Sequence, residues 1–311
     1  MSQGSWDEIR TAYQVARLGT VSGAADVLGV HHATVIRHID ALEGQLGTKL
    51  FQRHARGYTP TEAGRDLLQV AQTTDEQFSQ LAGRLKGRGE HVEGELVITT
   101  LAGFAPMLAP VLARLQLDNP DLTIRYLTDD RVFRLEYGEA HVAIRAGSAP
   151  SEPDNVVQKF FTERFTLFAS HEYLDKNGMP DLTGDLNGHR FIGPEDNIRR
   201  APFFRWIDEA VPEATLVFRT SDMRAMKYAM LGGVGIGFCS MWEGRQHPEL
   251  EQICLPREEW QVQMWLVTHV DLHRTAKVQA ALNHLKTEAR RWTQLRQEDE
   301  TRQGIHSSSE G

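Results

Sequence analysis

Apolar residues recur every three or four positions through residues 5–86, which predicts a series of helices. A first helix is expected at 5–18. A second, short helix begins at Val21 and ends at Gly29, because a residue without a Cβ readily takes the left-handed conformation that closes a helix. A third helix follows, and its expected buried stripe consists of Val35, Ile36, Ile39, Leu42 and Leu46.

The opposite face of the third helix is polar. It carries His31, His32, Thr34, Arg37 and His38. Two helices joined by a tight turn, the second with a hydrogen-bonding face, form the helix-turn-helix plan, in which the N-terminal part of the second helix reads base edges. The alternative is an ordinary helical hairpin with a solvated face. The Ala24-Ala25 pair followed by Gly29 and an amphipathic helix favours the DNA-reading interpretation.

The segment after the third helix is typical of a β-hairpin "wing". Leu50 and Phe51 are expected to anchor it in the core, and residues 54–58 form its tip. The residues that we expect to contact DNA, on bases or phosphates, are Ser22, His31, His32, Thr34, Val35, Arg37, His38, Arg53 and Arg56. Ser22 also suits a helix cap, and Arg53 and Arg56 suit phosphates.

A long helix is predicted from residue 60 to about 86. Thr59 is the expected cap, with Pro60 at the first helical position and Glu62 completing a capping box, while Thr61 is a competing cap. A heptad seam follows, formed by Leu67, Ala71, Thr74, Phe78, Leu81 and Leu85. The seam packs either on its own domain or on a second copy. We favour a homodimer, which would present two reading heads to a DNA site with two-fold symmetry.

Beyond a linker at 87–90 the pattern changes to alternating strands and helices, which predicts an α/β domain with a largely parallel sheet. The expected strands are 95–100, 122–127, 141–144, 165–169, 191–193, 216–220, 235–238 and 263–270. The expected helices are 104–117, 131–137, 171–176, 203–210, 223–230 and a closing helix at 276–291. The tail after Trp292 lacks an apolar period and is expected to be disordered.

In open α/β sheets, ligands bind beyond the carboxyl ends of the strands. That rule nominates an effector site made of Thr99, Thr100, Gly103, Phe104, Thr128, Asp129, Arg145, Ile192, Gly193, Pro194, Thr220 and Ser221. Each of these is also a plausible cap or turn residue. Helix N-terminal amides at such a site favour a carboxylate on the ligand, and Arg145 supports that hypothesis if it faces the cleft rather than an acid.

Composition narrows the range of functions. The formal charge of −8 disfavours a protein that coats nucleic acid, although residues 1–65 are near neutral, with seven Lys/Arg against six Asp/Glu. Two cysteines and the absence of a signal peptide or long apolar run indicate a cytoplasmic protein that does not cross a membrane.

No cofactor, metal site or catalytic group is predicted. His31, His32 and His38 have no Cys or carboxylate at ligand spacing for zinc, and the Gly-rich run 232–237 follows a helix rather than a strand. Cys239 lies in an apolar strand, where a packing role is usual. No nucleophile–base arrangement stands out, so the chain is not expected to be an enzyme.

The stretch AADVLGVHHATVIRHIDALEGQLGTKLFQR, followed by TPTEAGRDLL, resembles the N-terminal domain of the LysR-type transcriptional regulators. The segments LEYGEAHVAIRAG, ASHEYLDKNGMPDL, LNGHRFIG and AMLGGVGIGFCS resemble the effector-binding domain of that family. The chain departs from the family where the recognition helix begins, with His31-His32-Ala33 and Ile36-Arg37, so its preferred DNA sequence cannot be carried over.

The resemblance implies a winged helix-turn-helix at 1–60, a dimerisation helix and hinge at 61–90, and an effector-binding domain at 91–292, followed by the tail 293–311. It further implies two subdomains joined by two crossing strands, like periplasmic solute-binding proteins: 91–161 with 267–292, and 162–266. A small-molecule effector would bind between them, at the strand ends nominated above, and dimers would pair into tetramers. We therefore expect a sequence-specific transcription regulator. The alternative is a small-molecule binding module whose N-terminal helices serve only assembly.

Overall fold

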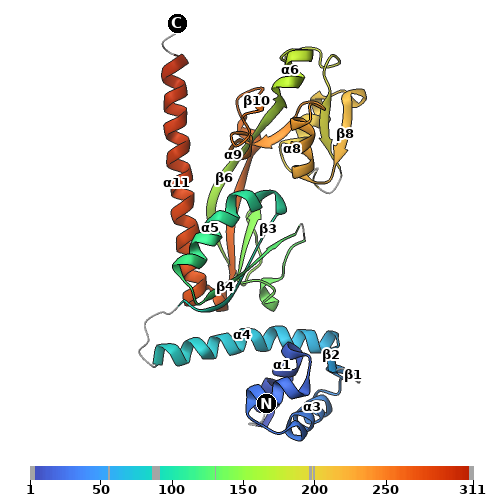
Figure 1. Ribbon diagram of the computed structural model, residues 1–311, viewed down its shortest axis with the longest axis vertical. Helices are drawn as coiled ribbons and strands as arrows, with labels where there is room; N and C mark the ends of the chain where they lie inside the picture. Colours follow the sequence, from blue (N-terminus) through green and yellow to red (C-terminus); the bar gives the residue numbers. More distant parts are fainter. Residues whose placement is uncertain are drawn as a thin grey trace.

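The structure is a computed structural model that describes residues 4–54, 57–85, 92–129, 131–195, 198 and 200–307. Figure 1 shows a small helical domain around the N-terminus, the long helix α4, and an α/β domain that ends in the long helix α11. The N-terminal elements are α1 Gly4–Leu18, α2 Val21–Leu28, α3 His32–Leu46, β1 Phe51–His54, β2 Gly57–Pro60 and α4 Glu62–Leu85. This is the winged helix-turn-helix that the sequence predicts.

The N-terminal core is built from the positions that the helical period singles out. Its members include Ala24, Ala25, Val35, Ile39, Leu42, Leu50 and Phe51, all buried. Two positions of the expected stripe behave differently: Ile36 is 38% exposed and Leu46 is 54% exposed. The stripe is therefore narrower than expected, because α1 and α2, which pack on α3, cover only the arc around Val35 and Ile39.

Local signals set the helix ends, although the capping residues differ from two predictions. Gly29 adopts φ +66° and ends α2 as expected. The N-cap of α2 is Thr20, whose hydroxyl accepts a hydrogen bond from the N–H of Gly23, so Ser22 is not the cap. The cap of α4 is Thr61, whose hydroxyl accepts from the N–H of Gly64, whereas Thr59 belongs to β2.

Helix α4 packs its first turns on its own domain. Leu67 lies against the N-terminal core, and Ala71 is buried. Further along, the ring of Phe78 meets Trp6 of α1 edge-on at 5.3 Å between centroids. Phe78 is nevertheless 52% exposed and Val70 is 58% exposed. The side chains of Leu81 and Leu85 lie outside the described residues.

The α/β domain has a mixed sheet rather than a largely parallel one. Its strands are β3 Gly94–Thr100, β4 Leu122–Thr128, β5 Val142–Ala146, β6 Asn155–Ser170, β7 Phe191–Pro194, β8 Leu216–Thr220, β9 Gly237–Ser240, β10 Leu250–Gln252 and β11 Gln261–His269. The main sheet has the order β10-β6-β11-β5-β3-β4, with β9 also on β6. Among the described residues, the parallel pairs of this sheet are β3 with β4 and β3 with β5, whereas β7 and β8 form a separate parallel pair. The sheet is mixed because β6 and β11 return through it in opposite directions.

The helices of this domain are α5 Ala105–Asp118, α6 His171–Asn177, α7 Phe204–Ala210, α8 Met223–Leu231, α9 Met241–Gly244, α10 Val270–His273 and α11 Ala276–Ser307. Single 3₁₀ turns are η1 Ala102–Phe104, η2 Leu135–Tyr137, η3 Glu213–Thr215 and η4 Glu258–Trp260. The helix expected at 131–137 is therefore only the turn η2. Within the described residues, no helix is long and apolar enough to cross a membrane.

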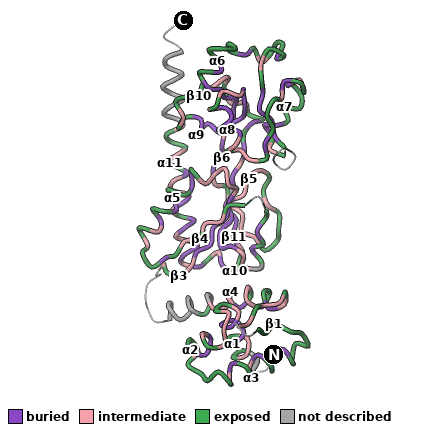
Figure 2. Tube along the Cα trace, turned by 45° about the vertical axis from the view of Figure 1, so that its right-hand side comes forward, coloured by how far each residue is buried: buried purple, intermediate pink, exposed green. Residues whose placement is uncertain are grey.

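Strand β6 connects two subdomains by changing partners along its length. Residues 155–164 pair with β11, whereas residues 165–170 pair with β9 and β10. The sequence pattern indicates only the second, more apolar half of this strand. Figure 2 shows buried residues following β6 and β11 through the domain. These two strands are the crossing strands between the subdomains.

Helix α11 continues past Trp292 to Ser307, so the prediction of a disordered tail from residue 293 is wrong for most of that segment. The indole of Trp292 packs on Phe161 at 5.1 Å between centroids, and Arg296 donates to the carbonyl of Thr162 at 2.7 Å. These contacts with β6 explain why the helix continues past Trp292. A helix with a weak apolar period can still form where a neighbouring strand provides packing and hydrogen-bond partners.

A carboxyl group, that of Glu163, is buried where β6 meets α9 and α11. Glu163 of β6 is 3% exposed, and its Oε1 accepts a hydrogen bond from the backbone N–H of Trp242 at 3.3 Å. Burial raises the pKa of Glu163 to about 7, against the opposing effects of that hydrogen bond and of the positive charges of Arg296 and Arg164. The folded chain therefore binds this proton more tightly than the unfolded chain, and the free energy of unfolding falls as pH rises from about 4.5 to about 7.

We expect Glu163→Gln to remove this dependence, because Gln keeps the size and the acceptor but does not ionise. At pH 8 the variant should exceed the wild type by about 2–4 kcal/mol in the free energy of unfolding, and near pH 4.5 the difference should vanish. Urea unfolding of the full chain at several pH values, followed by a probe in the α/β domain, measures this difference in the free energy of unfolding. Glu209→Gln, at an exposed site on α7, is the control, and a gap that does not change with pH would contradict the prediction.

Candidate DNA-binding surface and effector cleft

The N-terminal half of α3 presents one exposed stripe, hereafter the reading face. It consists of His32, Ala33, Ile36, Arg37 and Asp40, which recur every three or four residues. His31, the residue just before the helix, is also exposed and makes no side-chain cap. The N-terminal end of the helix is thus accessible to another molecule.

Several predicted DNA contacts have accessible side chains. His31, His32, Arg37 and Ser22 are exposed, and Thr34 is half-buried. Two do not share that surface. Val35 is 0% exposed in the N-terminal core, so its prediction as a DNA contact is wrong. His38 is half-buried and turns toward α1, where its Nδ1 lies 2.9 Å from the hydroxyl of Thr11.

Arg53, expected on phosphate, is already engaged within the domain. Its Nη2 lies 2.5 Å from Asp40 Oδ1 and 3.1 Å from Glu43 Oε2, and its guanidinium stands over the ring of Tyr58. The Asp40 contact raises the pKa of Arg53 despite partial burial. Arg53 therefore ties the wing to α3. Arg56 lies outside the described residues.

The carboxylate of Glu43 fixes the junction between α3 and the wing. Oε1 accepts hydrogen bonds from the backbone N–H groups of Leu50 at 2.9 Å and Phe51 at 3.2 Å. Oε2 lies 2.6 Å from Lys49 Nζ. Burial raises the pKa of Glu43, but the hydrogen bond from Lys49 and those from the two backbone groups outweigh it, so the net pKa is lowered.

The start of α4 approaches this junction closely. A Cβ on Gly64 would stand 2.0 Å from the carbonyl oxygen of Leu50, so no larger residue fits without moving the helix. The Thr61 hydroxyl also donates to the carbonyl of Lys49 at 2.7 Å. The Leu42-Glu43 and Thr61-Glu62-Ala63-Gly64 segments therefore meet in space and hold α3, the wing and α4 together.

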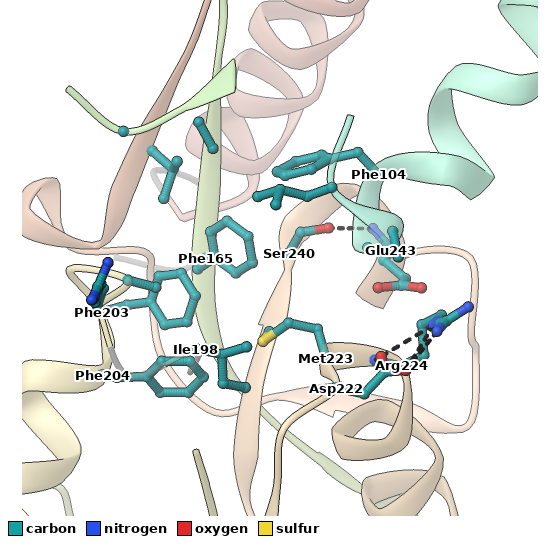
Figure 3. Close-up of a pocket in the computed structure, with 18 of the residues that line it drawn as sticks. Phe104, Phe165, Ile198, Phe203, Phe204, Asp222, Met223, Arg224, Ser240 and Glu243 are labelled. Carbon is teal, nitrogen blue, oxygen red and sulfur yellow. Dashed lines mark hydrogen bonds and ion pairs between the residues drawn. The ribbon is translucent and has the colours of Figure 1, made fainter. Parts of the chain in front are cut away.

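A cavity of about 530 Å³ lies between the two subdomains at the crossing strands. Its lining is contributed by both subdomains and by β6 and β11: Leu101, Ala102, Gly103, Phe104, Met107, Ala146, Gly147, Phe165, Ile198, Arg200, Ala201, Pro202, Phe203, Phe204, Ser221, Asp222, Met223, Arg224, Ser240, Trp242, Glu243 and Val262. Figure 3 shows the rings of Phe165, Phe203 and Phe204 on one side and the charged groups of Asp222, Arg224 and Glu243 on the other.

Most charges in this lining are paired. Arg224 Nη2 lies 2.6 Å from Asp222 Oδ2, and Glu243 Oε1 lies 2.6 Å from Lys227 Nζ behind the wall. Arg200 is exposed, and among the described residues no carboxylate pairs with it. Within the described part of its lining, the cavity thus combines an aromatic wall with the guanidinium of Arg200, which is available to an anionic group.

Three predicted effector residues line this cavity, namely Gly103, Phe104 and Ser221. The others are not in the lining. Thr99, Thr100, Thr220, Ile192, Gly193 and Pro194 are buried at strand ends, and Thr128 and Asp129 are exposed on the far side of β3. Arg145 donates to Glu152 at 3.0 Å and to the carbonyl of Phe133 at 3.1 Å, so it faces a neighbouring acid.

The sequence pattern did not indicate most of the cavity residues that the subdomain 162–266 contributes. Arg200 lies outside every predicted element. Phe203 and Phe204 lie at the start of the predicted helix 203–210, but the pattern did not show that they face a cavity. Trp242 and Glu243 lie in the short helix α9, which was not predicted. Phe165 was recognisable as a strand residue. The pattern did not show that Phe165 of β6 and Val262 of β11 line the cavity. The aromatic cluster in residues 203–206 was the one signal that could have drawn attention.

Two family models match the sequence. Residues 6–65 match the bacterial regulatory helix-turn-helix protein model of the lysR family, and residues 89–290 match the LysR substrate binding domain. The second match alone spans more than half of the chain. The chain therefore belongs to the LysR family of transcriptional regulators, with a DNA-binding domain and a substrate-binding domain.

Individual relatives agree with that assignment. The chain is 27% identical to the HTH-type transcriptional regulator DmlR of Escherichia coli over 289 residues, which is 90% of this chain and 93% of DmlR. It is 27% identical to CrgA of Neisseria meningitidis over 188 residues, 60% of this chain and 62% of CrgA. The match thus spans less than two thirds of CrgA.

Two solved structures share the fold. Full-length OxyR from Pseudomonas aeruginosa is 18% identical with a TM-score of 0.64, over 93% of this chain and 95% of that one. CrgA from Neisseria meningitidis is 22% identical with a TM-score of 0.56, over 91% and 98%. At these identities the likeness supports the winged helix-turn-helix and α/β architecture alone.

The Glu43 junction makes the N-terminal domain sensitive to acid. Because the pKa of Glu43 is lowered in the folded chain, its stabilising effect is present above the unfolded value near 4.5 and is lost as pH falls below it. We expect Glu43→Gln to lower the free energy of unfolding of the domain by about 1–3 kcal/mol at pH 7. The variant should also lose less of its free energy of unfolding than the wild type does as pH falls below 4.5. Denaturant unfolding of the full chain checks this, with Asp26→Asn at an exposed site on α2 as the control. Equal stability of variant and wild type at pH 7 would contradict the role assigned to Glu43.

Proposed function

We propose that this regulator places the reading face of α3 in the major groove of its operator. The observation that carries the proposal is the exposed stripe at the N-terminal end of α3, held rigidly by the burial of Val35 and Ile39. His31, His32, Thr34 and Arg37 are the proposed base-edge contacts. Ser22 and Arg56 are the proposed phosphate contacts, and Arg53 acts by holding the wing against Asp40 and Glu43.

We also propose that two copies associate through α4. The exposed side chains of Val70 and Phe78 support this, since a long helix with an uncovered apolar edge gains from burying it on a second copy. A homodimer would present two reading faces to a DNA site of approximate two-fold symmetry, and pairing of dimers would give a tetramer.

The cavity at the crossing strands is the proposed effector site. Its aromatic wall suits an apolar ligand body, and Arg200 suits an anionic group such as a carboxylate. A ligand that touches Phe104 from one subdomain and Ser221 from the other would bias the angle between the subdomains, which in turn would change the spacing of the reading heads.

The proposed boundaries are a DNA-binding domain at 1–60, a linker helix and hinge at 61–90, and an effector-binding domain that begins at 91 and is split into 91–161 with 267–292 and 162–266. Helix α11 extends this last domain beyond residue 292 to Ser307. We propose that the chain has no enzymatic activity and works in the cytoplasm, where operator DNA is located. The relatives are regulators, which supports the first point. A small-molecule binding module without DNA affinity is the competing function.

The DNA test begins with selection of bound sequences from a random duplex pool by the full chain. We expect one sequence with two half-sites to be enriched, and Arg37→Ala to weaken binding to it by about 1–3 kcal/mol at fixed salt, with little change on random DNA. Arg10→Ala, at an exposed site on α1, is the matched control. If the wild type enriches no sequence, the binding-module alternative takes precedence.

The effector test uses a panel of aromatic and branched aliphatic carboxylates with their neutral amides. We expect carboxylates to bind and raise the melting temperature more than the amides do. Arg200→Gln should weaken a binding carboxylate about tenfold, because one charge-assisted contact is lost at a partly exposed site. Isothermal titration measures the affinity, with Arg205→Gln on α7 as the control. Equal binding of acids and amides would exclude Arg200 as the anion contact.

A further inference from the structure

A branched apolar side chain lies within the polar reading face. Ile36 sits in the second turn of α3 and is 38% exposed, although the helical period assigns it to the buried stripe. The exposed part of this side chain is open to a partner from outside the domain. Among the described residues of the first two turns of α3, it is the one large apolar side chain that reaches the surface.

The packing of α3 keeps Ile36 at the surface. Val35 and Ile39, on either side of it in sequence, are both 0% exposed in the N-terminal core. A rotation of the helix that buried Ile36 would draw one of them out. The exposure of Ile36 is therefore a fixed property of the domain.

The neighbours of Ile36 favour a close approach to bases. Ala33, one turn earlier, is exposed and has only a methyl side chain, so nothing long separates that part of the helix from the floor of a groove. One turn later stands Asp40, whose charge Arg53 neutralises at 2.5 Å. The carboxylate that would otherwise repel a phosphate backbone next to Ile36 is thus paired.

The edges of base pairs in the major groove carry one apolar group, the C5-methyl of thymine, and apolar side chains contact it. We propose that Ile36 contacts the C5-methyl of one thymine in each half-site and so determines the identity of that base. The proposal rests on the placement of α3 in the major groove. It assigns a specificity role to a position that differs from the usual family residue.

The test removes the methyl group alone. In the sequence selected by the wild-type chain, each thymine is replaced in turn by deoxyuridine, which keeps every hydrogen-bonding group. We expect one position per half-site at which the replacement weakens binding about three- to tenfold, the effect of one lost methyl contact. The other thymines should tolerate uracil.

Protein variants then identify the side chain. Ile36→Ala should bind the thymine site about as weakly as the wild type binds the uracil site, and uracil should cause no further loss in that variant. Ile36→Val should keep part of the sensitivity. Leu46→Ala, at the other large exposed apolar residue of α3, should leave the sensitivity to uracil unchanged. Thermal melting of each variant checks that the domain remains folded.

Each other outcome overturns the proposal. Selective binding with no uracil-sensitive thymine would leave the DNA-reading function standing and remove the methyl contact. A uracil effect that persists in Ile36→Ala would assign the methyl to another residue. Failure of the wild type to select any sequence would instead defeat the placement of α3 and, with it, this inference.

Discussion

The hydrogen bonds to the Glu43 carboxylate hold the DNA-binding domain in its shape. Glu43 stands near the end of the recognition helix α3, and its two oxygens receive donors from the start of the wing. Arg53, on the wing, bridges back to the same carboxylate and to Asp40. The orientation of α3 and the position of the wing are therefore set together. A buried carboxylate with so many donors is strongly stabilising, because loss of the carboxylate would leave those donors without an acceptor.

The effector domain depends on a different constraint, the change of partners along β6. Its first part pairs with β11 and its last part with β9 and β10, so a single strand belongs to both subdomains. The cavity opens where that change occurs, beside Phe165. Because both subdomains contribute to the lining of the cavity, a ligand seated there can contact both. Helix α11 adds a further attachment to β6 through Trp292 and Arg296.

Helical and strand periods predicted the order of most elements, since burial on one face leaves a direct trace in the sequence. They did not define how wide a buried face is, and so Ile36 and Leu46 were assigned to the core. They did not separate Thr59 from Thr61 as a cap, because both precede the helix by a plausible distance. The polar first half of β6 escaped notice, since its stability comes from β11, some hundred residues later. The aromatic wall of the cavity was missed for the same reason: Phe203 and Phe204 line one cavity with Gly103 only because the fold brings these distant segments together.

The central claim, that the N-terminal end of α3 lies in the major groove, is tested most directly by cleavage of DNA from that site. An iron chelate attached to Ala33→Cys should cut the selected operator in two clusters, one in each half-site and about one helical turn apart. The unmodified chain, with buried Cys239 and partly buried Cys254, and a chelate on Leu117→Cys in the effector domain serve as controls. Cleavage from Ala33→Cys that matches the controls, or that is spread evenly along the DNA, would contradict the account.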